Sequence, residues 1–274
     1  MLKYFTKTAT GYSHIKNKSC CQDFSAVYHD EERTIITACD GHGGRIYIRS
    51  DLGSKFASKA LITVLQKIEN SLFYKYSKDE IAEKIKLAVL CEWNALVERS
   101  LSESRFTKRE VFNLSEEERR HLTFHPEKAY GTTLNGVMAF GNKLVCVNLG
   151  DGGVFTVKKG IVEPVFNAED DDTVANITYS MCAEDAYKHI NVAILDLREY
   201  DGVIACTDGV LNPYRNLPNF TVSFVKPVIC RLINDDYCAI ADFIEKLGNR
   251  LGIGDDVSFS VMMKSDVSAR HYKE

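Results

Sequence analysis

Long hydrophobic runs are absent from this chain of 274 residues. No stretch approaches the ~18–20 apolar residues that a membrane-spanning helix needs, and the N-terminus lacks the apolar core of a signal peptide. A long basic cluster is also absent, and 34 Lys and Arg against 38 Asp and Glu give a net charge of −4. Without an apolar segment of either kind, we expect a cytoplasmic protein that does not bind membranes. Because a basic cluster is what binds a nucleic-acid backbone, we also expect no nucleic-acid partner.

Paired cysteines and prolines are scarce. Of 9 cysteines, only Cys20 and Cys21 are adjacent, and no CxxC pair occurs, so neither a zinc knuckle nor a dithiol redox motif is expected. Most of the other cysteines lie in apolar runs, where a reduced thiol behaves as a small hydrophobic side chain. No linker rich in Pro, Gly or Ser divides the chain, which favours a single domain over residues 1–274.

Hydrophobic periodicity predicts both helices and strands. Apolar residues at helical spacing predict helices over residues 50–68, 78–101 and 240–251. Gly141–Asn142 predicts a hairpin turn between two apolar runs. The strands expected from apolar or alternating runs are 24–28, 34–39, 134–140, 143–149, 202–206 and 257–261. This order of elements predicts an α+β sandwich with helices segregated from the sheets.

Two stretches lack this periodicity. Residues 102–130 are polar and charged, and are interpreted as a surface insertion. Residues 166–190 are interpreted as a flap and contain the acidic run Glu169–Asp172. That run lacks the alternating spacing and the glycine of a calcium loop, so it is expected to be solvated rather than to bind a metal.

Carboxylates recur at the ends of predicted strands. Asp40–Gly41 and Asp208–Gly209 each follow a buried run, while Asp23 and Asp255 each precede a strand. An anion at the edge of the core must be neutralised by a neighbour. Without a Cys or His cluster, four carboxylates are oxygen ligands that suit Mg²⁺ or Mn²⁺. A single Asp-Gly is more often a turn, so the prediction depends on the joint order of these residues.

That order resembles the metal-dependent protein serine/threonine phosphatases of the 2C type. The most specific block is Asp40–Gly44, and the opening Gly11-x-Ser13–His14 followed by Cys21–Asp23 looks like a bacterial subgroup of this family. The other blocks, which occur in the family's order, are Gly131–Thr133, Gly150–Gly152, Thr207–Gly209 and Asp255–Ser258.

The resemblance implies a four-layer α/β/β/α sandwich, with two central antiparallel sheets flanked by helix pairs. It also implies that Asp40 bridges two Mn²⁺ or Mg²⁺ ions, that Asp208 and Asp255 hold the first ion, and that Asp23 and the carbonyl of Gly41 hold the second. A metal-activated water would then hydrolyse phosphoserine and phosphothreonine in proteins. The implied partners are a phosphorylated protein and an opposing Ser/Thr kinase, and the oligomeric state is left open.

The resemblance also assigns a proton donor and a phosphate ligand. His42 is expected to protonate the departing serine or threonine oxygen, a task that the ordinary histidine pKa suits. Lys18 stands where relatives often place an arginine that binds the substrate phosphate. A lysine supplies positive charge without the bidentate fork of arginine.

Two other positions depart from the family pattern. Gln22 replaces a frequent Glu, so it offers only a neutral ligand. A third, weaker metal would use Asp151 and Asp208. Since Asn212 stands where a carboxylate often follows Asp208, a stable third ion is not expected.

Two alternatives stay open at the level of the sequence. Cys39 and Arg45 have the spacing of the phosphate loop in cysteine-dependent tyrosine phosphatases, although Asp40 beside the sulfur would disfavour a thiolate. The second alternative is a phosphoprotein-binding regulatory module whose catalysis is impaired, as Gln22, Lys18 and Asn212 suggest. Against it, all four principal carboxylates are present.

Overall fold

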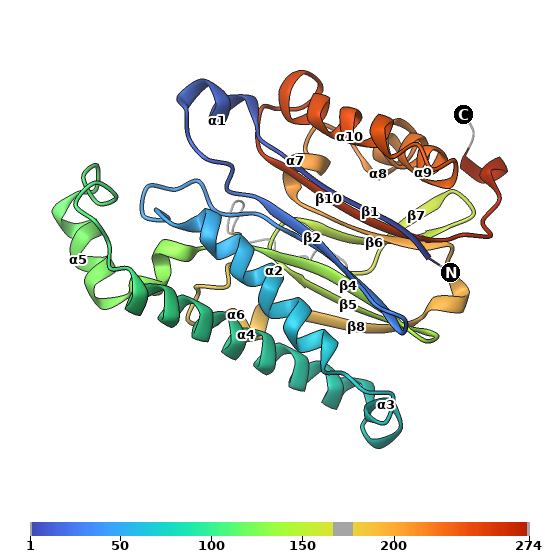
Figure 1. Cartoon of the computed structure of the whole chain (residues 1–274), viewed down its shortest axis with the longest axis horizontal. Coiled ribbons are helices and arrows are strands. Elements are labelled where there is room, and N and C mark those ends of the chain that lie inside the picture. The colour runs from blue at the N-terminus through green and yellow to red at the C-terminus, as the bar shows by residue number, and fades with distance from the viewer. Residues whose placement is uncertain (1, 167–177, 273–274) are drawn as a thin grey trace.

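Two five-stranded antiparallel sheets form the centre of the computed structural model, which describes residues 2–166 and 178–272 (Figure 1). In spatial order the first sheet contains β1 (Leu2–Ala9), β10 (Val257–Lys264), β9 (Gly202–Cys206), β6 (Gly153–Lys158) and β7 (Ile161–Pro164). The second contains β2 (Phe24–His29), β3 (Arg33–Cys39), β4 (Leu134–Phe140), β5 (Lys143–Leu149) and β8 (Asn191–Asp196).

Helices cover both outer faces. Helices α2 (Ser50–Gln66) and α4 (Lys78–Glu103) cover the second sheet, and α9 (Lys226–Ile233) and α10 (Tyr237–Lys246) cover the first (Figure 1). The predicted four-layer α+β sandwich is therefore confirmed. The shorter helices are α1 (Tyr12–Asn17), α3 (Leu72–Lys75), α5 (Glu116–Phe124), α6 (Ala186–His189), α7 (Asp208–Leu211) and α8 (Leu217–Phe220). Single turns lie at Pro126–Tyr130, Leu197–Glu199, Thr221–Val225, Leu247–Leu251 and Ala269–Tyr272.

The continuous apolar runs reflect burial on both faces of a strand. In β3, Ile35 packs toward α2 and α4, whereas its neighbour Ile36 packs between the two sheets. In β9, Ile204 faces the C-terminal helices, and Val203 lies between the sheets. Because successive side chains of a strand point to opposite faces, both faces need apolar residues.

The predicted helices and the hairpin are largely confirmed. The helices expected at 50–68 and 78–101 are α2 and α4, and α4 starts with a capping box formed by Ser77 and Glu80. Gly141, with a φ of +55°, turns the chain between β4 and β5 as its dipeptide predicts.

The periodicity missed other elements. β1 is a strand because it pairs with β10 along its whole length, a contact that its mixed polar composition does not announce. Helix α9, which continues from α8 through the helical turn Thr221–Val225, was also missed. None of the described helices has both the length and the apolar character to cross a membrane.

The segment expected to be a surface insertion contains α5 and is tied to the rest of the fold by Arg49. This side chain is 5% exposed; its Nε donates to Glu110 at 2.6 Å and its Nη1 donates to the hydroxyl of Tyr130 at 2.8 Å. Its hydrogen bond lowers the pKa of Glu110 to about 2. The insertion is thereby attached to the loop between β3 and α2.

The expected flap is described only in part. Residues 167–177, which include the acidic run, lie outside the described residues. Beyond them Met181, Cys182 and Ile190 are buried in the cluster beneath α2 and α4. The C-terminal end of this segment is therefore anchored, and the flap stays a prediction.

Trp93 is the largest fully buried side chain of α4, and its ring nitrogen donates to the carbonyl of Gly53 at 3.3 Å. We expect Trp93→Ala to lower the free energy of unfolding by ~3–5 kcal/mol, because it leaves a cavity between α2 and α4. Leu87→Ala is the matched control, since Leu87 is on the same helix and 56% exposed; it should change stability by less than ~0.5 kcal/mol. Urea unfolding followed by circular dichroism measures both, and equal losses would contradict the packing described here.

Candidate metal centre

The register of the strands brings the predicted carboxylates to one end of the sandwich. Phe24 of β2 pairs with Cys39 of β3, so Asp23 and Asp40 lie side by side just beyond the pair. Cys206 of β9 pairs with Gly153 of β6, which brings Asp208 near Asp151 in the same way. This end lies beside α1 and α7 in Figure 1. Antiparallel pairing places the start of one strand beside the end of its neighbour, so residues far apart in the sequence meet there.

Five carboxylates gather at this end and are called the acidic cluster: Asp23, Asp40, Asp151, Asp208 and Asp255. One oxygen each from Asp40, Asp151 and Asp208 lies within 4.8 Å of the others. Asp23 is 5% exposed and accepts a hydrogen bond of 2.8 Å from Thr207. The described residues that line the adjoining pocket of about 160 Å³ are His14, Gln22, Asp40, Gly41, His42, Gly43, Asp151, Thr178, Asp255 and Asp256.

The cluster carries uncompensated negative charge. Burial raises the pKa of Asp23 and of Asp40 well above the ordinary value, and the charges of Asp23 and Asp208 raise that of Asp40 further. Burial and the charge of Asp151 raise the pKa of Asp208. Among the described side chains, no Lys or Arg forms a salt bridge with any of the five carboxylates. Hard divalent cations would supply the missing charge, so the donor set fits Mg²⁺ or Mn²⁺.

The backbone of Asp40 is clamped by the Gly131–Thr133 block. Its N–H donates to Oγ1 of Thr133 at 3.0 Å, and its carbonyl accepts from the N–H of Thr133 and from Oγ1 of Thr132, both at 2.8 Å. The next residue, Gly41, has no room for a side chain, because a Cβ would lie 2.5 Å from the carbonyl oxygen of Gln22. The block therefore holds one carboxylate in place without using its side chain.

Two of the departures from the family pattern have structural roles. The amide of Gln22 donates to Oγ of Ser50 at 2.6 Å and to the carbonyl of His42 at 3.2 Å. Asn212 donates to Oδ2 of Asp208 at 2.8 Å. Gln22 thus supports the loop that carries His42, and Asn212 orients a carboxylate of the cluster.

The residue whose importance the sequence reasoning missed is Asp256. It is 3% exposed; its Oδ1 accepts from the N–H of Gly11 and its Oδ2 from the N–H of Gln22, each at 2.7 Å. The same Oδ2 lies 2.8 Å from Nδ1 of His14. The sequence signal for this role is the second aspartate in Asp255–Asp256. In the structure Asp255 is exposed, whereas Asp256 is buried.

His42 and Lys18 lie in different surroundings. The ring of His42 lines the pocket and packs edge-on against Tyr47, with 4.9 Å between centroids. Burial lowers its pKa, and the charge of Asp151 opposes that effect. Lys18 is exposed, ends α1 in a left-handed conformation, and is not among the described residues that line the pocket.

Comparison with protein families identifies the family of this chain. The family model described as Protein phosphatase 2C matches residues 10–245. The chain is a member of this family. It is therefore a protein phosphatase, as the order of its motifs predicts. A search of curated proteins finds no match.

Solved structures share the fold of this phosphatase. A bacterial serine phosphatase aligns with a TM-score of 0.61 at 15% identity, covering 98% of this chain and 100% of its own. The catalytic domain of the phosphatase PstP in complex with two manganese ions aligns at 0.55 and 16%, covering 96% and 97%. Stp1 from Staphylococcus aureus aligns at 0.57 and 14%, covering 96% and 95%. At these identities the similarity shows the fold alone.

The cysteine-dependent alternative does not fit the structure of this phosphatase. Cys39 is fully buried in β3, and burial raises the pKa of its thiol. The side chain of Arg45 is 66% exposed and bonds to the carbonyl of Asn113 and to Glu118 in the insertion. An attacking thiolate needs access and positive surroundings, and Cys39 has neither.

Replacing one carboxylate of the acidic cluster by a neutral amide tests the electrostatic repulsion between these carboxylates. Because the pKa of Asp40 is raised in the folded protein, its charged form is disfavoured there, and Asp40→Asn should stabilise the metal-free protein at pH 7. A gain of ~1 kcal/mol would raise Tm by about 2–4 °C. Asp242→Asn is the control, since Asp242 pairs with Lys246 at the surface. Thermal unfolding in EDTA measures both, and a fall in Tm for Asp40→Asn would contradict the repulsion.

Proposed function

We propose that this phosphatase hydrolyses phosphoserine and phosphothreonine in proteins with two Mn²⁺ or Mg²⁺ ions held by the acidic cluster. The observation that carries the proposal is the cluster itself: five carboxylates gather without a Lys or Arg salt-bridge partner among the described residues, and the pKa values of Asp23, Asp40 and Asp208 are raised. Family membership and the manganese-bound relative PstP support it. The substrates would be products of a Ser/Thr kinase that acts in opposition.

Asp40 suits a bridging position because it contacts both halves of the cluster. It lies against Asp23 on one side and shares the compact trio with Asp151 and Asp208 on the other. In the proposed arrangement Asp208 and Asp255 hold the first ion, and Asp23 and the carbonyl of Gly41 hold the second. Bound there, the ions would supply an activated water and neutralise the phosphate oxygens during in-line displacement.

The structure supports Asp151 as a metal ligand more strongly than the sequence did. One of its oxygens lies within 4.8 Å of ligand oxygens of Asp40 and Asp208, and its Oδ2 accepts from Thr178 at 2.6 Å. We therefore include Asp151 among the ligands that a third ion would use. Asn212 donates to Oδ2 of Asp208 at 2.8 Å and is neutral, so it adds no further carboxylate, and we expect a third ion to bind more weakly than the first two.

The remaining chemistry falls to His42. Its imidazole borders the pocket, packs against Tyr47, and lies so close to Gly131 that a Cβ there would be 2.8 Å from its Cδ2; its backbone N–H donates to the carbonyl of Gly131 at 3.1 Å. In the proposed reaction this imidazole donates a proton to the serine or threonine oxygen as the bond to phosphorus breaks.

The first test is turnover of a phosphothreonine peptide by EDTA-treated protein titrated with Mn²⁺. Activity should appear only with metal and should survive thiol alkylation. Asp40→Asn and Asp208→Asn should lower kcat by ~10²–10³-fold or more while circular dichroism stays unchanged. The control Asp242→Asn should keep full activity. Full activity in either cluster variant would refute the metal assignment, and binding of the phosphopeptide without turnover would favour the regulatory module.

The role of His42 is tested by changing the leaving group. His42→Ala should lower kcat on the phosphothreonine peptide by ~10²–10⁴-fold, because an alkoxide leaves poorly without a proton. On p-nitrophenyl phosphate, whose leaving group needs no proton, the loss should be much smaller. His125→Ala is the control, since the side chain of that histidine is 43% exposed and lies in the insertion. Equal losses on the two substrates would show that His42 is not the proton donor.

A further inference from the structure

The pocket beside the acidic cluster contains a histidine to which the proposed chemistry gives no task. Of the described side chains that line it, only His14 and His42 can carry a positive charge. In the proposed reaction His42 donates its proton to the departing serine or threonine oxygen. A substrate phosphate would also need donors for its other oxygens, and Lys18 is absent from the lining. His14 is the side chain left to supply one.

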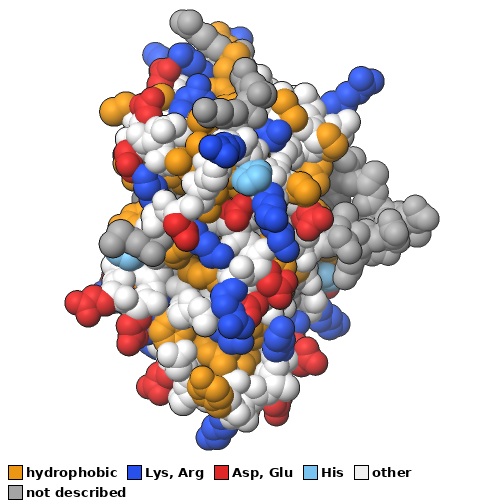
Figure 2. Space-filling view, turned by 90° about the vertical axis from the view of Figure 1, so that its right-hand side faces the viewer, with side chains coloured by type: hydrophobic (Ala, Val, Ile, Leu, Met, Phe, Trp, Pro, Cys, Tyr) orange, Lys and Arg blue, Asp and Glu red, His pale blue; other side chains and the backbone are white. Residues whose placement is uncertain are grey.

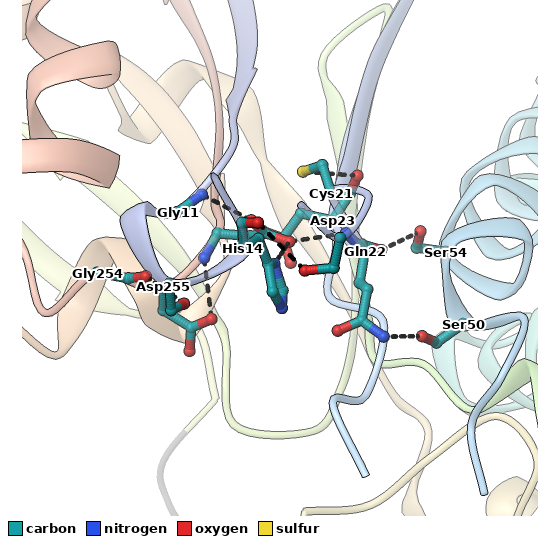
Figure 3. A network of polar contacts seen from close by, with 12 residues as sticks. Gly11, His14, Cys21, Gln22, Asp23, Ser50, Ser54, Gly254 and Asp255 are labelled. Atoms are coloured by element: carbon teal, nitrogen blue, oxygen red, sulfur yellow. Dashed lines mark hydrogen bonds and ion pairs between the residues drawn. The ribbon is translucent and has the colours of Figure 1, made fainter. Parts of the chain in front are cut away.

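The ring of His14 is held in place from behind. Its Nδ1 lies 2.8 Å from Oδ2 of Asp256, and its side chain is 20% exposed against 3% for Asp256. Figure 3 shows the ring between the side chains of Asp255 and Gln22. Nδ1 is buried and faces the carboxylate of Asp256 at ion-pair distance without hydrogen-bond geometry, so Nε2 is the ring atom left for the pocket, and no described residue forms a hydrogen bond with it. The protonated ring donates from both nitrogens, so Nε2 can donate to an anion.

The backbone around His14 is equally well tied. The N–H and the hydroxyl of Ser13 both donate to the carbonyl of Gly254, at 3.0 and 2.6 Å, and the N–H of Gly11 donates to Asp256 at 2.7 Å. Gln22, which precedes the cluster residue Asp23, binds the same carboxylate of Asp256. One buried carboxylate therefore sets the position of His14 relative to the acidic cluster.

We propose that His14, positioned by Asp256, binds the phosphate group of the substrate, in the role that the sequence assigned to Lys18. The inference deepens the proposed function and rests on it. His14 is the phosphate ligand, and Asp256 is a positioning residue that acts through it. A charge-assisted hydrogen bond from Nε2 would contact a phosphate oxygen that the metal ions do not hold.

Two substitutions separate this role from a structural one. His14→Asn places an amide N–H near the position of Nδ1, so it keeps the contact with Asp256 and loses the donor that faces the pocket. His14→Gln places its amide near the position of Nε2 and keeps that donor. With Mn²⁺ saturating, His14→Asn should raise KM for the phosphothreonine peptide by ~10–100-fold with kcat nearly unchanged. His14→Gln should recover part of the loss.

The matched control is Lys16→Ala, an exposed residue of the same helix, which should leave KM within twofold. A structural role for His14 predicts the reverse order, with His14→Gln more damaging than His14→Asn and with Tm lowered. A rise in KM for Lys18→Ala together with a normal His14→Asn would overturn the inference and restore Lys18.

A binding measurement makes the test independent of turnover. Inorganic phosphate is titrated into the Mg²⁺-loaded protein labelled with ¹⁵N-histidine, and the Nε2 signal that disappears in His14→Asn is followed. A saturable shift, with phosphate affinity ~10–100-fold weaker in His14→Asn, supports the inference even if the protein shows no turnover. Normal turnover with no shift of this signal would overturn the inference and leave the proposed function standing. No turnover and no shift would overturn both.

Discussion

Repulsion between carboxylates held close together in poorly solvated surroundings is the constraint on which this site depends. Asp23 is buried and Asp40 beside it is half-buried; burial raises the pKa of both, and the charges of Asp23 and Asp208 raise the pKa of Asp40 further. A fold that keeps such groups together without a cationic side chain must have another source of positive charge or must lose stability. The stability of the phosphatase and its affinity for divalent ions are therefore coupled, since binding of the ions removes the repulsion.

The sandwich resists this repulsion through its backbone rather than through the carboxylates themselves. Thr132 and Thr133 hold the main chain of Asp40, and Thr207 links Asp23 to the neighbouring strand pair. Both sheets contribute, so separation of the carboxylates would require the sheets to move apart. The charged site is concentrated at this end; the face at the opposite end of the sandwich mixes both signs with hydrophobic side chains (Figure 2).

A second layer of contacts joins this end to the rest of the chain. Asp256 connects the turn before α1, the residue before Asp23 and the ring of His14, while Arg49 connects the loop after Asp40 to the insertion. Asp256 and Arg49 are each a buried charged group with several partners, so removal of one partner would weaken the compensation of a buried charge. The geometry of the pocket thus depends on residues that do not reach the metal positions.

The sequence by itself determined the family, part of the two outer helix pairs, and the residues of the acidic cluster. Those features are local: a motif such as Asp40–Gly44 or the helical repeat of α2 is complete within a short stretch, and the order of several motifs identifies the family. Only the tertiary structure decided that β1 is a strand, that Asp256 is a hub, and that His14 rather than Lys18 borders the pocket. Each of these depends on contacts across more than 200 residues, because strand pairing and burial are set by partners far away in the chain.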